Sequence, residues 1–478
     1  MQNRIPARGL LIRHLTLLCL APTFAWPGDH GSGPKTGSLN ATAHGVATAP
    51  GVSQADLPAG VVEIAPDGAW TWFNDERALW HRGRLYAGYV TRAGTVGLSQ
   101  YDPVAGQARS YALGGARARQ VDDHNNPALI SRSDGRLVAI YSKHGSAKEY
   151  YTRISLNEHP ASPYDWSGEQ VVGVPAGNTY ANAFQLAAEA DKIHLFHRCI
   201  NWNPTLSFST NGGVSWGPAN HFITAGKSRS VRPYLRLASN HHDRIDVLYT
   251  DGHPRDVENS VYHLFYQRGS FLRTDGGLIK TLDRLPLDHA AGERGSLVYA
   301  YTPALGRGWV WDVHYDPRGN PVSAYQTRRT DVTGTGWNHG RIYYHYAIWA
   351  GTEWRSTLIA QGGRALYEKE NDYGGGMAID PDDSRIVYIA TNAARPFQTT
   401  NLDDVPLSAS ERYEIWRGFT VDGGKTFAWT PVTRDSQEDN IRPIVPENHG
   451  DRPGVLWVRG RYTTYTDYQT RIVGLVRD

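Results

Sequence analysis

Short runs of alternating, or β-branched and aromatic, residues recur along the chain and are separated by turn-forming residues. Such runs predict β-strands, because successive side chains on a strand point to opposite faces. No stretch shows a helical repeat longer than a turn or two. The clearest predicted strands are residues 84–90, 136–141, 192–196, 244–249 and 385–389. The pattern therefore predicts an all-β protein.

Two segments, Ser209–Trp216 and Thr420–Phe427, share the more specific pattern S/T-x-D/N-x-G-x-S/T-aromatic. In such a segment the Asp or Asn side chain hydrogen-bonds the backbone, the glycine supplies a positive φ, and the aromatic ring packs under the next hairpin. The pattern resembles the Asp-box of neuraminidase-type repeats, which marks the blades of β-propellers. We expect both copies to shape hairpins and neither to touch a substrate.

The composition is that of a folded globular protein. Of 478 residues, 40% are hydrophobic and 20% are charged, and the chain holds 15 Trp, 27 Tyr and 11 Phe, which is enough apolar surface for a large core. The 50 Gly and 27 Pro argue against long helices. About 420 residues at roughly 40 to 60 per blade predict a single β-propeller of seven blades, spanning residues 57–478.

The first 25 residues have the features of an export signal. Three arginines precede a short apolar run at residues 15–21, and small residues follow at a cleavage site. We therefore expect residues 1–25 to be a signal peptide, residues 26–56 to be a flexible linker, and the protein to be secreted or periplasmic. An N-terminal membrane anchor is the alternative, disfavoured because the apolar run is short and Pro22 follows it.

Charge and motifs exclude several classes of function. The 49 Lys and Arg against 47 Asp and Glu give a net charge of +2, too balanced to predict binding to nucleic acid or to an acidic membrane. No P-loop, GxSxG, HExxH or paired CxxC motif occurs, which argues against phosphoryl transfer, α/β-hydrolase and common zinc chemistry. A metal site among Asp251, His253, His263 and His314 stays open.

Polar side chains are dense around two predicted strands. His124, within DDHNNP, leads into one strand, and His144, within YSKHG, follows it. Each histidine alone is equally well explained as a turn residue beside a carboxylate, but so varied a polar set is not needed to make a turn. Tyr180 and Arg198 bracket the next strand. A buried arginine needs an anionic partner, either a structural Asp or an acid group of a substrate.

Taken together, these segments resemble the ulvan lyases of polysaccharide-lyase families twenty-four and twenty-five. The likeness extends over most of the chain, from DDHNNP and YSKHG through NTYANAFQL, LFHR, RPYLRLAS, TDGHPRD, WDVHYD, YGGGMAIDP and NIRP to RGRYTTYTDY. The resemblance implies a secreted enzyme that cleaves ulvan, a sulfated algal polysaccharide, between rhamnose 3-sulfate and a uronic acid. The products would be 4,5-unsaturated uronyl oligosaccharides.

The resemblance also assigns roles. His124 and His144 match the histidines of the lyase site, Tyr180 the catalytic tyrosine, and Arg198 the arginine that faces the uronate. For β-elimination we expect His124 to be the base and Tyr180 the acid, with His144 as a second contact and Arg198 stabilising the developing charge. Further candidates for sulfate or sugar-ring contacts are Asn125, Lys143, Asn201, Arg232, Tyr234 and His253.

The implied chemistry needs no cofactor, while a structural divalent cation stays open. The expected partner is a sulfated polysaccharide containing uronic acid, with no nucleic acid or membrane, and we expect a monomer. Two other functions also stay open: a glycoside hydrolase, rhamnosidase or sialidase-like, and a non-catalytic glycan-binding propeller. A sialidase would carry an Arg-Ile-Pro segment in the mature protein, but here that triplet stands at residues 4–6, within the expected signal peptide.

Overall fold

The computed structural model describes residues 57–226, 231–329, 341–368, 370–400, 406, 408–452 and 454–476. The expected signal peptide and linker lie outside these residues. Residues 52–478 form one compact unit. No helix in the described part of the chain is both long and apolar enough to cross a membrane.

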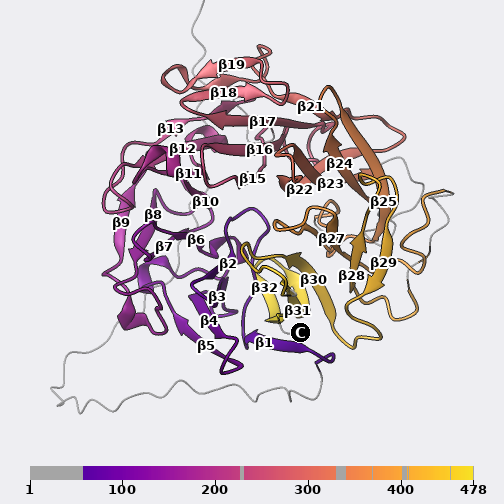
Figure 1. The fold of residues 1–478 in the computed structure, drawn as a ribbon, viewed down its shortest axis with the longest axis horizontal. Coiled ribbons are helices and arrows are strands. Elements are labelled where there is room, and N and C mark those ends of the chain that lie inside the picture. The colour runs from indigo at the N-terminus through magenta and orange to yellow at the C-terminus, as the bar shows by residue number, and fades with distance from the viewer. Residues whose placement is uncertain are drawn as a thin grey trace, which may run out of the picture. The chain divides into compact units, whose positions relative to one another are not determined.

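Seven antiparallel sheets follow one another along the chain and stand in a ring (Figure 1). The first three sheets each contain four strands in sequence order. They are β2 (Ala78–His81), β3 (Arg84–Val90), β4 (Val96–Asp102) and β5 (Gln107–Ala112); β6 (Ala128–Ser131), β7 (Leu137–Ser142), β8 (Glu149–Ile154) and β9 (Gln170–Gly173); and β10 (Thr179–Gln185), β11 (Ile193–Arg198), β12 (Pro204–Ser209) and β13 (Asn220–His221).

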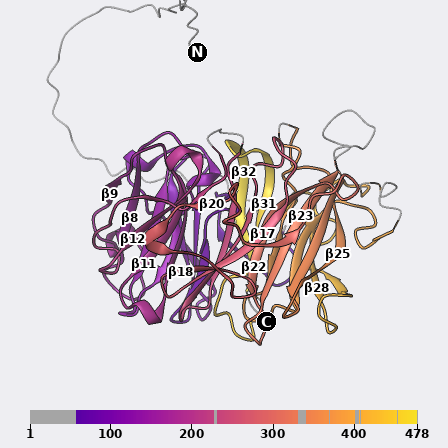
Figure 2. The ribbon, with the colours of Figure 1, turned by 90° about the horizontal axis from the view of Figure 1, so that it is seen from above.

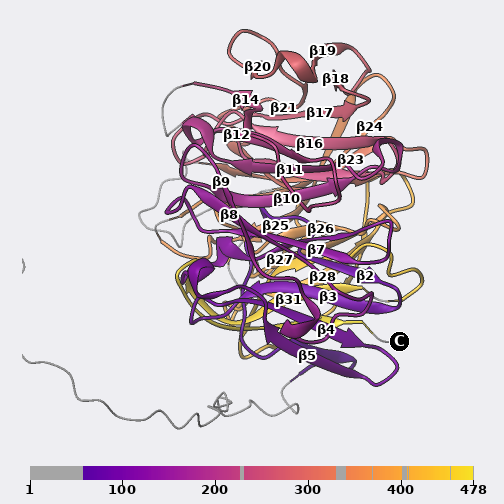
Figure 3. The same cartoon turned by 90° about the vertical axis from the view of Figure 1, so that its left-hand side faces the viewer.

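The fourth sheet is larger, because a sixth strand pairs with its third strand. It contains β15 (Leu235–Ser239), β16 (Arg244–Thr250), β17 (Val261–Gln267), β18 (Ser270–Arg273), β19 (Leu278–Thr281) and β21 (Ser296–Tyr299). A parallel pair, β14 (Ile223–Thr224) and β20 (Leu287–Asp288), lies at the outer edge of this blade (Figure 3).

The fifth and sixth sheets return to four strands in sequence order, and the seventh closes the ring. They are β22 (Arg307–Tyr315), β23 (Pro321–Arg329), β24 (Arg341–Trp349) and β25 (Trp354–Gly363); β26 (Met377–Ile379), β27 (Ile386–Thr391), β28 (Glu414–Phe419) and β29 (Ala428–Pro431); and β30 (Asp439–Ile444), β31 (Val455–Thr464) and β32 (Asp467–Leu475) with β1 (Val61–Ala65). Because β1 pairs with β32, the first and last described strands share one blade.

The predicted seven-bladed, all-β propeller is therefore confirmed. The strands expected from alternation correspond to β3, β7, β11, β16 and β27. In the described residues the helices are short 3₁₀ turns: η2 (Ala116–Ala118), η3 (Asp123–Asn125), η4 (Pro163–Asp165), η5 (Ala187–Glu189), η6 (Ile200–Trp202) and η7 (Leu282–Arg284). Figure 2 shows strands such as β23 and β25 running from one face of the ring to the other.

The hydrophobic core lies between neighbouring blades. Leu79, Leu98 and Leu129 belong to a cluster that joins the first and second blades, and similar clusters join the second to the third and the third to the fourth. The largest cluster joins the fourth, fifth, sixth, seventh and first blades. Apolar surface between twisted sheets thus holds the ring together. The described residues contain no disulfide, and Cys199 is a free buried thiol.

The centre of the ring is occupied by residues 66–77, which connect β1 to β2 and which we call the axial segment (Figure 1). The Trp72 indole donates to the carbonyl of Val310 in the fifth blade at 3.2 Å, and the Trp70 indole donates to that of Arg442 in the seventh at 3.2 Å. Both indoles are almost completely buried. The axial segment therefore fixes distant blades to one another.

Both Asp-box segments form hairpin turns, as predicted. Asn211 accepts a hydrogen bond from the Ser215 backbone N–H at 2.9 Å, and Asp422 accepts one from that of Thr426 at 3.0 Å. The second glycine of the first turn, Gly213, has φ of +88°, which glycine adopts without strain. Neither hairpin contributes to the polar cluster described next.

Candidate active site

The first strand of each blade begins, and the second ends, on the same face of the ring, and the candidate residues gather there. His124 lies on η3, just before β6, and His144 lies just after β7. The Asp122 carboxylate accepts from Nδ1 of His124 at 2.7 Å with one oxygen and from Nδ1 of His144 at 2.8 Å with the other. The imidazole rings stack with centroids 4.1 Å apart. One buried carboxylate thus holds both histidines.

The seventh blade secures the turn that carries His124. The Asp123 carboxylate is fully buried and accepts hydrogen bonds from the Arg442 guanidinium and, at 2.5 Å, from the Tyr462 hydroxyl. The Asp123 backbone N–H donates to the Tyr465 carbonyl at 2.9 Å. The Tyr465 ring also packs edge-on against both imidazoles. Closure of the ring therefore helps to place the histidine pair.

Tyr180 and Arg198 come from the next blade, where Thr179 at the start of β10 pairs with Arg198 at the end of β11. The Arg198 guanidinium lies 4.7 Å from the centre of the Tyr180 ring and 3.5 Å from its hydroxyl. It also donates to the Tyr234 hydroxyl at 3.2 Å and lies 3.3 Å from Nε2 of His144. Three consecutive blades thus meet at one guanidinium.

Arg198 is buried without a carboxylate. Only 5% of its surface is exposed, and its Nε has no hydrogen-bond partner. Throughout the described part of the chain, no Asp or Glu oxygen lies within 4.0 Å of its guanidinium nitrogens. Since burying an unpaired charge is costly, the site is suited to receive an anionic group from a ligand.

The histidines differ in charge because their surroundings differ. Burial would lower the pKa of His124, but the carboxylates of Asp122 and Asp123 outweigh it and raise the pKa to about 9. Burial and the positive charge of His124 lower the pKa of His144 to about 4, which the hydrogen bond to Asp122 offsets only in part. Despite its own burial, Asp122 has a pKa well below its usual range, because both rings favour its ionised form.

The two tyrosines at Arg198 also differ. Burial raises the pKa of Tyr180 well above its usual value, so this phenol keeps its proton at neutral pH. Burial acts in the same direction on Tyr234, but the guanidinium groups of Arg198 and Arg232 outweigh it and lower the pKa of that phenol. Arg232 donates to the Tyr234 hydroxyl at 3.1 Å.

The structure brings together His124, His144, Tyr180, Arg198, Arg232 and Tyr234. His253 packs edge-on against Tyr234 with centroids 5.4 Å apart, and burial together with nearby Arg255 lowers its pKa to about 2. Lys143 is half-buried beside His144. Asn201 is exposed on η6, whereas Asn125 is fully buried, with its amide 3.3 Å from the Gln120 carbonyl.

Sequence reasoning gave no role to three residues of the cluster. Asp122 stands within DDHNNP, where the sequence does not distinguish a carboxylate that binds a histidine from one that caps a helix. Asp122 does both, since it also accepts a hydrogen bond from the His124 backbone N–H. Tyr465 gives no local signal. Glu370, bonded to Arg255 at 2.7 Å and 3.6 Å from Nε2 of His253, stands in a polar and aromatic run whose partners only the fold reveals.

The four residues considered as a metal site do not come together. His263 bonds to Asp246 and Thr274, His314 lies beside Asp312, and Asp251 bonds to His289. In the described ranges, the one group of three potential ligands with donor atoms within 4.8 Å of one another is Asp122, His124 and His144. There both Nδ1 atoms are already hydrogen-bonded to the carboxylate, so hydrogen bonds account for the arrangement.

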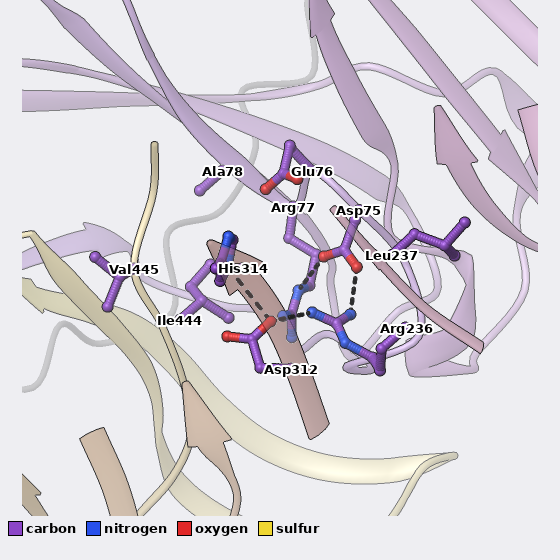
Figure 4. Close-up of a pocket in the computed structure, with 10 residues that line it drawn as sticks. All are labelled: Asp75, Glu76, Arg77, Ala78, Arg236, Leu237, Asp312, His314, Ile444 and Val445. Atoms are coloured by element: carbon purple, nitrogen blue, oxygen red, sulfur yellow. Dashed lines mark hydrogen bonds and ion pairs between the residues drawn. The ribbon is translucent and has the colours of Figure 1, made fainter. Parts of the chain in front are cut away.

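A second buried cluster of charges lies on the axis of the ring, around a small cavity (Figure 4). There Arg236 makes ion pairs with Asp75 of the axial segment and, at 3.1 Å, with Asp312 of the fifth blade. Arg77 lies 3.6 Å from Asp75, and His314 lies 3.5 Å from Asp312. Each of these arginines has an acidic partner within the fold, so we interpret the cluster as structural.

Comparison with known proteins agrees with the fold. Residues 84–362 match a family described as BNR repeat-containing. A solved ulvan lyase of polysaccharide lyase family twenty-five is 14% identical, with a TM-score of 0.63, covering 87% of this chain and 96% of that chain. A structure from that family bound to -[GlcA(1-4)Rha3S]- gives the same values. At this identity the likeness shows a shared fold alone. The chain has no significant match among curated proteins.

Proposed function

The chain belongs to the BNR repeat-containing family, and we propose that its polar cluster binds an acidic polysaccharide and cleaves it by β-elimination. The substrate we propose is ulvan, cut between rhamnose 3-sulfate and a uronic acid. The observation that carries the proposal is Arg198, a buried guanidinium surrounded by two phenols and an imidazole rather than by carboxylates. A uronate carboxylate would supply the missing negative charge.

The residue types suit each step of the reaction. A base of the histidine pair takes the proton from C5 of the uronate, and the electrons of that C–H bond form the C4–C5 double bond. The bond from C4 to the leaving oxygen breaks, and Tyr180 donates its proton to that oxygen. Arg198 stabilises the charge that develops on the carboxylate, a contribution of about 3 to 4 kcal/mol for one well-placed donor. No oxidant or cofactor enters this scheme.

The solved lyase bound to a glucuronate–rhamnose sulfate segment supports the choice of substrate class, since it has the same fold. Secretion, the signal peptide at residues 1–25 and a monomeric state accompany this proposal as predictions. A structural divalent cation, for which the described residues offer no further candidate group, remains a hypothesis.

Incubating the purified protein with ulvan tests the proposal. We expect ultraviolet absorbance to rise together with new reducing ends, because the new double bond is conjugated with the carboxylate. Reducing ends without absorbance would instead indicate a hydrolase. Retention of the polysaccharide with neither signal would indicate a glycan-binding propeller.

Two variants test the assignment of residues. His124→Ala, which disrupts the histidine pair, and Tyr180→Phe, which removes the proton donor, should each lower product formation by about 10²- to 10⁴-fold. Tyr164→Phe is the matched control, since that phenol is 89% exposed and should behave as wild type. Near-wild-type rates for Tyr180→Phe would remove that residue as the acid.

A further inference from the structure

The two imidazoles share one carboxylate but meet different neighbours. His124 is buried, with 3% of its side chain exposed, and its Nδ1 lies 3.0 Å from Asp123 as well as 2.7 Å from Asp122. His144 is 23% exposed, and its Nε2 faces the Arg198 guanidinium at 3.3 Å. His124 thus lies between carboxylates, and His144 lies between a carboxylate and a cation.

The charges around the two imidazoles balance when one ring is protonated to an imidazolium and the other ring is neutral. The Asp123 carboxylate is matched by Arg442, which leaves Asp122 to balance one imidazolium. A second imidazolium at His144 would place a positive charge against both His124 and Arg198. The remaining titratable groups around the pair are the phenols of Tyr180 and Tyr465 and the Glu370 carboxylate. The phenols keep their protons at neutral pH.

The hydrogen bonds also fix the tautomers. Each Nδ1 donates to an ionised Asp122 oxygen, so each Nδ1 carries a hydrogen. On neutral His144 the lone pair is then on Nε2, the atom that faces Arg198 and the position where a uronate carboxylate would bind. That nitrogen lies beside the guanidinium that would bind the uronate. Asp122, through Nδ1–H, together with the bound uronate carboxylate would offset the positive charge of a proton gained there.

We propose that Asp122 is a positioning residue that gives the two histidines different roles: it retains a proton on His124, and it leaves His144 as the neutral base that removes the C5 proton. This inference rests on the proposed function and deepens it. His124 then acts as a fixed cation behind the reacting groups. The alternative within the same site is the assignment of the base to His124, which requires that ring to lose its proton first.

The dependence of kcat/KM on pH separates the two assignments. With His144 as base, kcat/KM should rise as His144 loses its proton near pH 4 and fall as His124 loses its proton near pH 9. With His124 as base, kcat/KM should instead continue to rise through pH 9. That second profile would overturn the proposal, while a wild-type protein that forms no unsaturated product would overturn the proposed function itself.

Asp122→Asn tests the positioning role directly. The amide can accept from one Nδ1–H only, so we expect the upper limb of the profile to move from about pH 9 toward the ordinary 6.5. At mildly alkaline pH, kcat/KM should fall by about 10²-fold or more. Asp380→Asn is the matched control, because Asp380 is a buried carboxylate that pairs with His449 at 2.9 Å directly after β26, away from the site. An unshifted upper limb in Asp122→Asn would contradict the role.

A measurement without turnover completes the test. In protein carrying isotope-labelled histidine, NMR titration should show one ring of the pair titrating near pH 4 and the other near pH 9. His124→Gln and His144→Gln identify the two signals by their disappearance. In Asp122→Asn the two titrations should approach each other. Two rings that titrate together in wild type would overturn the inference even if the enzyme is a lyase.

Discussion

Two buried arginines of this propeller have opposite surroundings. Arg236, on the axis, is paired with Asp75 and Asp312, and its charge is balanced by the fold (Figure 4). Arg198, at the face of the ring, contacts Tyr180, Tyr234 and His144, and its charge is not balanced by any of them. The difference distinguishes a charge that stabilises the fold from one that we propose binds an anionic ligand.

The largest effect we expect concerns stability. Arg236→Ala removes the cation that bridges two buried carboxylates and leaves them only Arg77 at 3.6 Å and His314 at 3.5 Å, which should lower the free energy of unfolding by about 3 to 5 kcal/mol. Urea unfolding followed by tryptophan fluorescence measures this. The control is Arg136→Ala, whose ion pair with Asp134 is at the surface and should contribute at most about 1 kcal/mol. Equal losses in the two variants would remove the structural role of the axial cluster.

The next effect concerns turnover rather than stability. Arg198→Ala should lower kcat/KM on ulvan by about 10²- to 10³-fold, because the uronate loses its cation. Its free energy of unfolding should change far less than that of Arg236→Ala, since no carboxylate loses a partner. Steady-state rates and urea unfolding of the same preparation give both numbers. If Arg198→Ala were as destabilised as Arg236→Ala, the contrast between the two arginines would fail.

The smallest effect we expect is on stability, from a substitution in an Asp-box hairpin that lies outside both arginine clusters. Asn211→Ala removes the side-chain oxygen that accepts from the Ser209 hydroxyl at 3.0 Å and the Ser215 backbone N–H at 2.9 Å. It should lower the free energy of unfolding by about 1 kcal/mol and leave kcat/KM unchanged. A loss of activity at constant stability would mean that the Asp-box contributes to substrate binding after all.

The sequence predicted the blades more completely than it predicted the centre of the ring. Strands such as Arg84–Val90 have an alternation that depends on local residues alone, and β3 has those bounds. The axial segment gives no such signal. Trp70 and Trp72 are buried by contacts with blades more than 200 residues away, and no periodicity within twelve residues reveals such contacts.

Only part of the candidate site could be predicted from the sequence. His124, His144, Tyr180 and Arg198 stand at strand ends, and the propeller brings neighbouring strand ends together, so their proximity follows from the topology. Asp122 and Glu370 were not assigned, because a carboxylate near a turn or beside an arginine looks the same whether it orients a histidine or caps a loop. The prediction of a metal site among Asp251, His253, His263 and His314 was wrong, because the sequence does not show which way each side chain points. His263 bonds to Asp246 within its own sheet instead of pointing toward His253.

The axial segment has a consequence for how a polymer is handled. The buried indoles of Trp70 and Trp72 occupy the middle of the ring, so we expect the proposed polysaccharide substrate to stay on one face. Substrate would then bind, and cleaved fragments would leave, at the same face of the ring. Under the proposed function, fragments that stay bound at that face would block the next cleavage, so the reaction should slow as products accumulate.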